Sequence, residues 1–197
     1  MPAIPLPSSS RPSKRAHAAV SESALIATAA RLFGAGRRAG AGVEFGIGDD
    51  TAVLAPPARG MRQVFTVDTL AAGTHFTLAD PPQAVGWKAM AVNISDIAAM
   101  GGMPAYAVIS LALPPGTPRA YAEGVLRGIR RAAREFGVRV AGGDTIGCGV
   151  ISVSIAMLGL VERGHVCYRH GARPGDVLAV TGPLGGSLRS GRHLRFT

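Results

Sequence analysis

The hydrophobic positions along the chain switch between helical and strand periodicity. Apolar residues recur at helical spacing over residues 21–33, 80–97 and 121–136, which predicts amphipathic helices there. Ser21 and Asp80 stand at the N-terminal ends of the first two stretches and are predicted to cap them. The arginines of the third stretch are predicted to form its solvated face.

Runs of apolar and β-branched residues between the helices predict strands. They cover residues 52–54, 63–67, 105–113, 138–141, 150–161 and 177–181. The segment 34–42 is rich in glycine and arginine and is predicted to be a loop. Residues 1–20 are rich in Pro, Ser, Arg and Ala, which predicts a disordered leader.

Composition and charge limit the core and the partners. Apolar residues make up 47% of the chain and aromatic residues only 5%, so the core is expected to be Ala, Val, Leu and Ile. The net charge is +9, but residues 1–20 and 187–197 each carry +3 and no acid, which leaves +3 for the rest. A nucleic-acid site would need its basic residues within the folded part, so we expect no nucleic-acid partner.

The sequence also bears on location. No apolar run reaches the roughly 18 residues that span a bilayer, so no membrane association is expected. Two cysteines are too few for a disulfide scaffold, and no apolar signal segment follows the basic N-terminal residues. A reduced cytoplasm is therefore the expected compartment.

Two adjacent carboxylates, Asp49 and Asp50, follow Gly46-Ile47-Gly48 in a predicted turn. At about 4 Å and an effective dielectric near 20, their repulsion costs roughly 4 kcal/mol. A hard cation such as Mg²⁺ or Ca²⁺ would remove this cost. For this stretch taken alone, a solvated Asx-turn is the better explanation of the pair, so a metal site needs further carboxylates in similar settings.

The chain supplies three more carboxylates of this kind. Asp68 is predicted at the C-terminal end of a strand, and Asp144 in a glycine turn after another strand. Asp96 stands in an otherwise apolar helix, where it should be partly buried and share a face with Asn93. Asp68 could also be a turn residue, and the loop residue His75 could simply be solvated. Converging carboxylates would suit several Mg²⁺ ions and phosphoryl transfer.

Several segments together resemble the thiamine-monophosphate kinase family, within the superfamily of ATP-binding proteins that includes aminoimidazole ribonucleotide synthetase. The segments are Gly46-Ile47-Gly48-Asp49-Asp50, Asp68-Thr69-Leu70 with Gly73-Thr74-His75-Phe76, Asn93-Ile94-Ser95-Asp96-Ile97-Ala98-Ala99-Met100-Gly101, and Gly142-Gly143-Asp144-Thr145. The resemblance extends from about Leu25 to the C-terminus. It implies an α/β (α+β) fold, with a mixed sheet flanked by helices that pairs with the sheet of a second subunit in a homodimer.

The resemblance further implies ATP-dependent phosphorylation of thiamine monophosphate to thiamine diphosphate, with several Mg²⁺ ions. The metal ligands would be Asp50, Asp68, Asp96 and Asp144, with Asp49 in support and Thr66 as a further oxygen ligand. Gly143 and Asp144 would contact ATP, and Arg169 would contact its phosphates. His75 would contact thiamine phosphate.

The resemblance also predicts the domain organisation. Residues 21–181 would form the ATP- and Mg²⁺-binding domain, and residues 182–197 would begin a linker to a second α/β domain that the family has and this chain lacks. Val67 departs from the family pattern, where a hydroxyl residue often precedes the aspartate. Two alternatives stay open: a non-catalytic module that binds Mg-ATP or dimerises, and a sister enzyme of the same superfamily.

Overall fold

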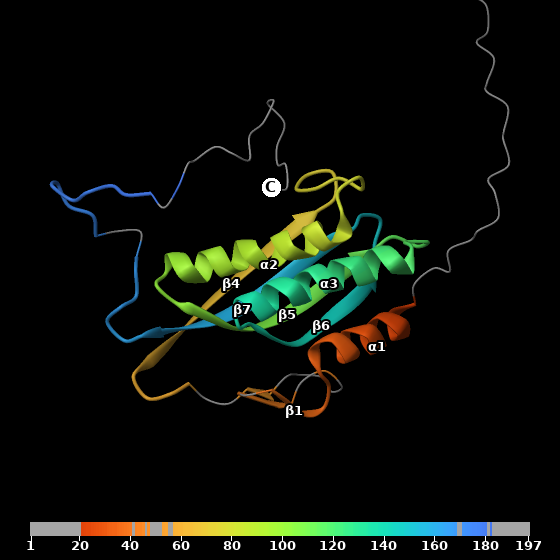
Figure 1. Cartoon of the computed structure of the whole chain (residues 1–197), viewed down its shortest axis with the longest axis horizontal. Coiled ribbons are helices and arrows are strands. Elements are labelled where there is room, and N and C mark those ends of the chain that lie inside the picture. The colour runs from red at the N-terminus through yellow and green to blue at the C-terminus, as the bar shows by residue number, and fades with distance from the viewer. Residues whose placement is uncertain are drawn as a thin grey trace, which may run out of the picture.

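The computed structural model describes residues 21–40, 42–45, 47, 53–54, 57–168, 171–180 and 182. In this part the helices and strands follow one another as Figure 1 shows. Their bounds are α1 Glu22–Phe33, β1 Arg37–Gly40, β2 Val43–Phe45, β3 Val53–Leu54, β4 Met61–Ala71, α2 Pro82–Ala99, β5 Met103–Leu113, α3 Arg119–Glu135, β6 Arg139–Gly147 and β7 Ser152–Glu162. None of the helices in these ranges is long and apolar enough to cross a bilayer.

The main sheet has the strand order β4-β7-β5-β6. β7 pairs antiparallel with β4 on one side and with β5 on the other, whereas β5 and β6 are parallel. Parallel neighbours need a crossover connection, and α3 supplies it between β5 and β6. The mixed sheet is therefore confirmed, with β4 and β6 as its edges.

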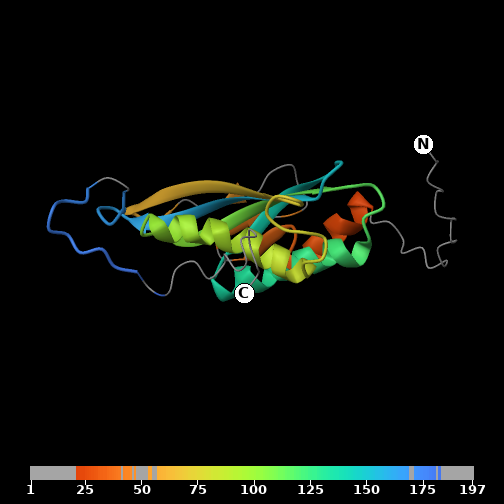
Figure 2. The ribbon, with the colours of Figure 1, turned by 90° about the horizontal axis from the view of Figure 1, so that it is seen from above.

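Helices α2 and α3 lie side by side on one face of this sheet (Figures 1 and 2). Val85, Ile129, Val153 and Ile155 are completely buried between the two layers. α1 packs beside α3 and β6, and the small sheet β1-β2-β3 lies next to them. Burial of one helical face against one sheet face is the main stabilising contribution, as the apolar patterning predicts.

Two glycines allow α2 and α3 to approach closely. A Cβ added to Gly128 would meet the backbone of Gln83 on α2, with 2.7 Å to its carbonyl carbon. A Cβ added to Gly86 would lie 2.9 Å from the backbone nitrogen of Ile129 on α3. Backbone atoms cannot move aside as side chains do, so these positions require glycine.

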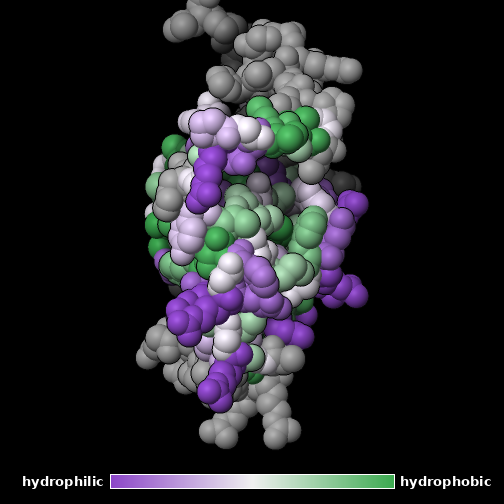
Figure 3. Space-filling model, turned by 90° about the vertical axis from the view of Figure 1, so that its left-hand side faces the viewer, coloured by the Kyte–Doolittle hydropathy of each residue, from purple (hydrophilic) through white to green (hydrophobic). Residues whose placement is uncertain are grey.

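The opposite face of the sheet carries large exposed apolar side chains. Phe65 is 72% exposed, Val67 60%, Met103 72%, Val108 40% and Ile146 49%. We call this sheet face the open face. Figure 3 views the molecule from one end, where β4 begins, and shows hydrophobic side chains gathered between hydrophilic ones at that end.

The structure corrects the predicted elements at the N-terminal side. The loop predicted for residues 34–42 contains the short strand β1. Asp80 does not cap α2: Pro81 is the N-cap residue, and no side chain caps the helix. Asp80 instead accepts hydrogen bonds from the backbone nitrogen of Thr77 at 2.6 Å and from its hydroxyl at 3.0 Å. The prediction for Ser21 is confirmed, because its hydroxyl accepts from the Ala24 nitrogen.

Residues 177–180 are not a strand in the structure, although their β-branched composition predicts one. Val177 is 90% exposed and Leu178 96% exposed. A strand needs hydrogen-bonding partners on a neighbouring strand, and the described part of the chain offers none at this place. Composition alone therefore overstated the strand content at the C-terminal side.

Candidate functional site

Thr66 and Asp96, 30 residues apart in sequence, are brought together where α2 lies over the edge strand β4. The Thr66 hydroxyl donates a hydrogen bond to Oδ2 of Asp96 at 2.8 Å. Asp96 is exposed, so the prediction of a partly buried carboxylate is wrong. The helix turns the apolar Ile97, 1% exposed, and the polar Asn93, 0% exposed, inward and leaves Asp96 at the margin. Asn93 and Asp96 therefore do not share an environment, although they are three residues apart.

Asp68 lies two residues beyond Thr66 on the same strand. The prediction that it ends the strand is wrong, because β4 continues to Ala71. Since side chains alternate along a strand, Thr66, Asp68 and the buried Leu70 share the face that the helices cover. The edge between α2 and β4 thus carries a hydroxyl and two carboxylates, the hard oxygen ligands that suit Mg²⁺.

These oxygens fit a magnesium ion by ligand type. Among the described residues no group of three His, Cys, Asp or Glu is arranged to hold a metal ion. Asp49 and Asp50, the predicted partners of Asp68 and Asp96, lie outside the described residues, and so does Arg169. The predicted cluster of metal ligands therefore remains a prediction.

Asp144 lies at the other edge of the sheet. It belongs to β6 and not to a glycine turn, which corrects the prediction, and it pairs with Ser110. Ser110 and Val108 are two residues apart on β5, so both lie on the open face. Asp144, which pairs with Ser110, therefore also lies on the open face, opposite to the face of Asp68. Three strand spacings, about 14 Å, separate the two backbones across the sheet. One chain therefore does not bring Asp144 to Asp96.

Gly143 has a structural role in the described chain. A Cβ at this position would meet the backbone of Ile109 on β5, with 3.0 Å to its carbonyl carbon and a still closer approach to the carbonyl oxygen. The close pairing of β5 and β6 therefore requires glycine here. Its predicted contact with ATP is untested, and any substitution of Gly143 would first disturb the sheet.

His75 lies in the loop that joins β4 to α2. Its Nδ1 accepts a hydrogen bond from the backbone nitrogen of Ala71 at 3.1 Å. Its carbonyl oxygen accepts a hydrogen bond from Nζ of Lys88 at 2.8 Å. Partial burial lowers the pKa of the Lys88 ammonium group, and the nearby Asp80 carboxylate opposes this shift. His75 is thus held by its neighbours and is not simply a solvated loop residue.

Lys88 was missed by the sequence reasoning. It interrupts an apolar stretch of α2, between Trp87 and Ala89. A single charged residue in such a stretch was the signal that could have identified it. A polar row across the sheet was also missed. Thr69, Ser154, Ser110 and Asp144 lie in register on neighbouring strands, and the hydroxyls of Thr69 and Ser154 are 2.7 Å apart.

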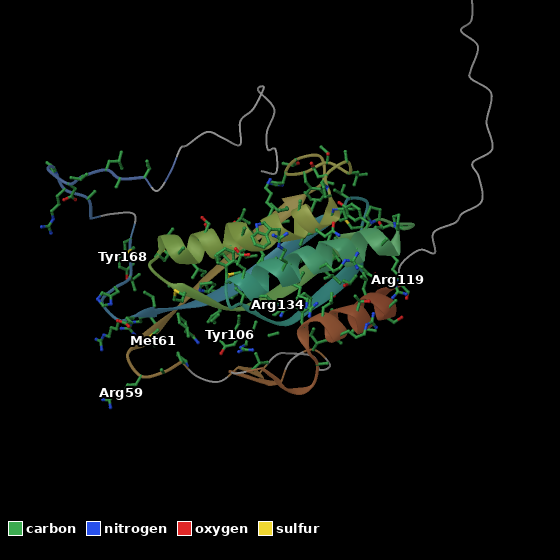
Figure 4. All side chains as sticks on the ribbon, in the orientation of Figure 1. Arg59, Met61, Tyr106, Arg119, Arg134 and Tyr168 are labelled. Carbon is green, nitrogen blue, oxygen red and sulfur yellow. The ribbon has the colours of Figure 1, made fainter. Side chains whose placement is uncertain are left out.

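The segment before Arg169 returns to the end of α2. The backbone nitrogen of Cys167 donates a hydrogen bond to the carbonyl oxygen of Met100 at 3.0 Å. Gly101 leaves room for this segment, because a Cβ added there would lie 2.7 Å from the carbonyl oxygen of His165. Figure 4 shows Tyr168 at the end of the molecule that also holds Met61. The chain therefore approaches the end of α2 one turn beyond Asp96.

Comparison with known proteins gives consistent matches. The family described as AIR synthase related protein, N-terminal domain, matches residues 48–161. Thiamine-monophosphate kinase of Rhodopirellula baltica is 44% identical over 161 residues, covering 78% of this chain and 50% of that protein. Thiamine-monophosphate kinase of Bacillus subtilis is 38% identical over 147 residues, covering 74% of this chain and 45% of that protein.

A solved structure agrees with these relatives. AaThiL complexed with AMPPCP and TMP has a TM-score of 0.56 and 37% sequence identity, covering 61% of this chain and 38% of that one. The chain spans about half the length of the curated relatives that it matches. The shared region therefore corresponds to part of those proteins.

Proposed function

We propose that this chain is the ATP-binding part of a thiamine-monophosphate kinase. The chain belongs to the family described as AIR synthase related protein, N-terminal domain. The complex of AaThiL with AMPPCP and TMP carries this proposal, since that protein shares the fold at 37% identity and holds an ATP analogue together with TMP. The curated relatives bear the name of the same kinase. The reaction uses ATP, and we place it in the cytoplasm.

The proposed reaction is an in-line phosphoryl transfer. The bond between the γ-phosphorus of ATP and the oxygen that bridges to the β-phosphate breaks. A bond from that phosphorus to a phosphate oxygen of thiamine monophosphate forms, which leaves ADP and thiamine diphosphate. The acceptor is already an anion, so the protein needs only to align the two phosphates and offset their charge, without a covalent intermediate.

The oxygen ligands at the edge of α2 and β4 would serve this alignment. Thr66, Asp68 and Asp96 would hold Mg²⁺, with Asp49 and Asp50 as the predicted further ligands. When bound there, Mg²⁺ would supply positive charge that offsets the negative charge of the phosphates during the transfer. The hydrogen bond from Thr66 already fixes the direction of one Asp96 oxygen.

A homodimer is part of the proposal. The open face presents Phe65 at 72% and Met103 at 72% exposure, and a second copy of the sheet would remove these side chains from water. Asp144 lies on this same face, so a second copy seated there would enclose Asp144 between the two subunits, whereas Asp68 and Asp96 lie on the helix-covered side of the sheet.

Sedimentation equilibrium tests the dimer. We expect the purified chain to sediment as a dimer and Phe65→Ser to shift it toward the monomer. Leu78→Ser is the matched control, because Leu78 is 68% exposed in the loop between β4 and α2 and does not belong to the sheet. A parent chain that sediments as a monomer would overturn the proposed dimer. An equal shift toward the monomer in Leu78→Ser would overturn the assignment of the dimer interface to the open face.

Calorimetric titration with Mg-ATP tests the nucleotide site. We expect binding that depends on Mg²⁺ and is lost in Asp96→Asn, while Glu135→Gln, which removes an exposed acid at the end of α3, leaves it unchanged. Because the chain spans about half of its relatives, we expect little formation of thiamine diphosphate by the chain alone. Unchanged affinity in Asp96→Asn would remove Asp96 from the site.

A second candidate is a module that binds Mg-ATP or dimerises without catalysis. A longer form that extends past Thr197 and converts thiamine monophosphate would exclude the module. A longer form that phosphorylates a different acceptor would instead favour a sister enzyme of the superfamily. Product analysis with thiamine monophosphate as the acceptor separates these outcomes.

A further inference from the structure

The loop between β4 and α2 is tied down along its whole length. The backbone nitrogen of Gly73 donates to Phe76 at 2.8 Å, and that of His75 donates to Ala71 at 2.9 Å. Phe76 is only 4% exposed and anchors the loop in the core. Asp80 closes its far end through its two hydrogen bonds from Thr77. These hydrogen bonds and the buried Phe76 hold the loop in one conformation.

This loop fixes the tautomer of His75. The ring nitrogen Nδ1 accepts a hydrogen bond from the backbone N–H of Ala71, so it carries no proton. The neutral imidazole then carries its proton on Nε2, because one ring nitrogen is a donor whenever the other is an acceptor. His75 can therefore act only as a hydrogen-bond donor toward a ligand, and a phosphate oxygen is a matching acceptor.

Lys88 holds the same loop from α2. Its Nζ donates to the carbonyl oxygen of His75 at 2.8 Å, which joins the first half of the helix to the loop. Lys88 precedes Asp96 by eight residues, about 12 Å along the helix axis. One helix thus sets the position of the His75 loop and of a candidate metal ligand at the same time.

We infer that Lys88 is a positioning residue that, together with the Ala71 N–H, presents His75 Nε2–H as a donor to the phosphate of the substrate. The substrate named here, thiamine monophosphate, rests on the function proposed above. The orientation of the ring does not rest on that function. Without Lys88 the carbonyl group of His75 loses its hydrogen bond from α2, and we expect the ring to leave the Ala71 N–H part of the time.

Nitrogen-15 NMR of the imidazole rings in the full 197-residue chain tests the inference. We expect His75, assigned through the signals lost in His75→Gln, to show the Nε2–H tautomer in the parent chain. Lys88→Met, which keeps the stem but removes the donor, should give a mixture of tautomers, and Lys88→Arg should restore the parent pattern. The Nδ1–H tautomer in the parent chain would overturn the inference, and this result does not depend on the Lys88 variants.

Addition of thiamine monophosphate separates the inference from the proposed function. We expect the His75 Nε2 signal to shift and Lys88→Met to weaken binding about five- to tenfold, as the loss of one oriented hydrogen bond implies. Binding of equal affinity and an unchanged tautomer in Lys88→Met would overturn the inference and leave the function standing. The expected tautomers without any response to thiamine monophosphate would support the role of Lys88 and contradict the proposed substrate.

Discussion

Replacement of Gly128 by alanine tests the close approach of α2 and α3. The added Cβ would lie 2.7 Å from the carbonyl carbon of Gln83, whereas ordinary contact begins at 3.4 Å. The helices would have to separate by more than about 0.7 Å, because the carbonyl oxygen of Gln83 lies still closer to the added Cβ than the carbonyl carbon does. A gap of about 0.5–1 Å already forfeits a quarter to a half of the dispersion energy of the facing atoms. Overpacking of this kind lowers the stability of the folded state by about 3 kcal/mol at the upper end. The better helix propensity of alanine offsets about 1 kcal/mol of this loss. We expect Gly128→Ala to lower the free energy of unfolding by about 2 kcal/mol.

Urea unfolding followed by circular dichroism measures this change. A loss of about 2 kcal/mol corresponds to a fall in Tm of roughly 4–8 °C for a domain of this size. Gly147→Ala is the control, because no heavy atom lies within 4 Å of its added Cβ, and we expect a change below about 0.5 kcal/mol. A midpoint of Gly128→Ala equal to or above that of the parent chain, with an unchanged slope, would refute the close helix packing.

Further predictions concern the site and the surface. Thr66→Val removes the hydrogen-bond donor to Asp96 and should weaken Mg²⁺ binding several-fold. Because this hydrogen bond is exposed, its loss should lower the free energy of unfolding by only about 0.5–1 kcal/mol. Calorimetry that finds equal Mg²⁺ affinity would exclude Thr66 from the site. Gly143→Ala should lower the urea midpoint because its Cβ would meet the Ile109 backbone, and an unchanged midpoint would contradict that contact. Hydrogen bonds from arginine lower the pKa of Glu123 below its ordinary 4.5, so Glu123→Gln should be less stable than the parent above about pH 4.5 and should approach it as the pH falls through the folded pKa; a difference that stays constant down to pH 3 would exclude this ion pair as the cause.

Helices were predicted well because local patterning carries them. The arginine-rich helix predicted for residues 121–136 is Arg119–Glu135 in the structure, with Val125 and Ile129 buried as the periodicity indicates. Capping was predicted less well, since the alternative bonds of Asp80 to Thr77 depend on how the preceding loop closes. The ends of strands were also misplaced, because a strand extends as far as its neighbours pair with it, which no local pattern reports.

The sequence by itself determined which residue types are available for a site and which side of each helix is apolar, because residue type and period are local properties. Tertiary structure alone decided which of those residues meet. It joined Thr66 to Asp96 at 2.8 Å across 30 positions and placed Asp144 on the other face and the other edge of the sheet. The reason is that strand order and register, which set these neighbours, depend on pairing between segments far apart in the chain.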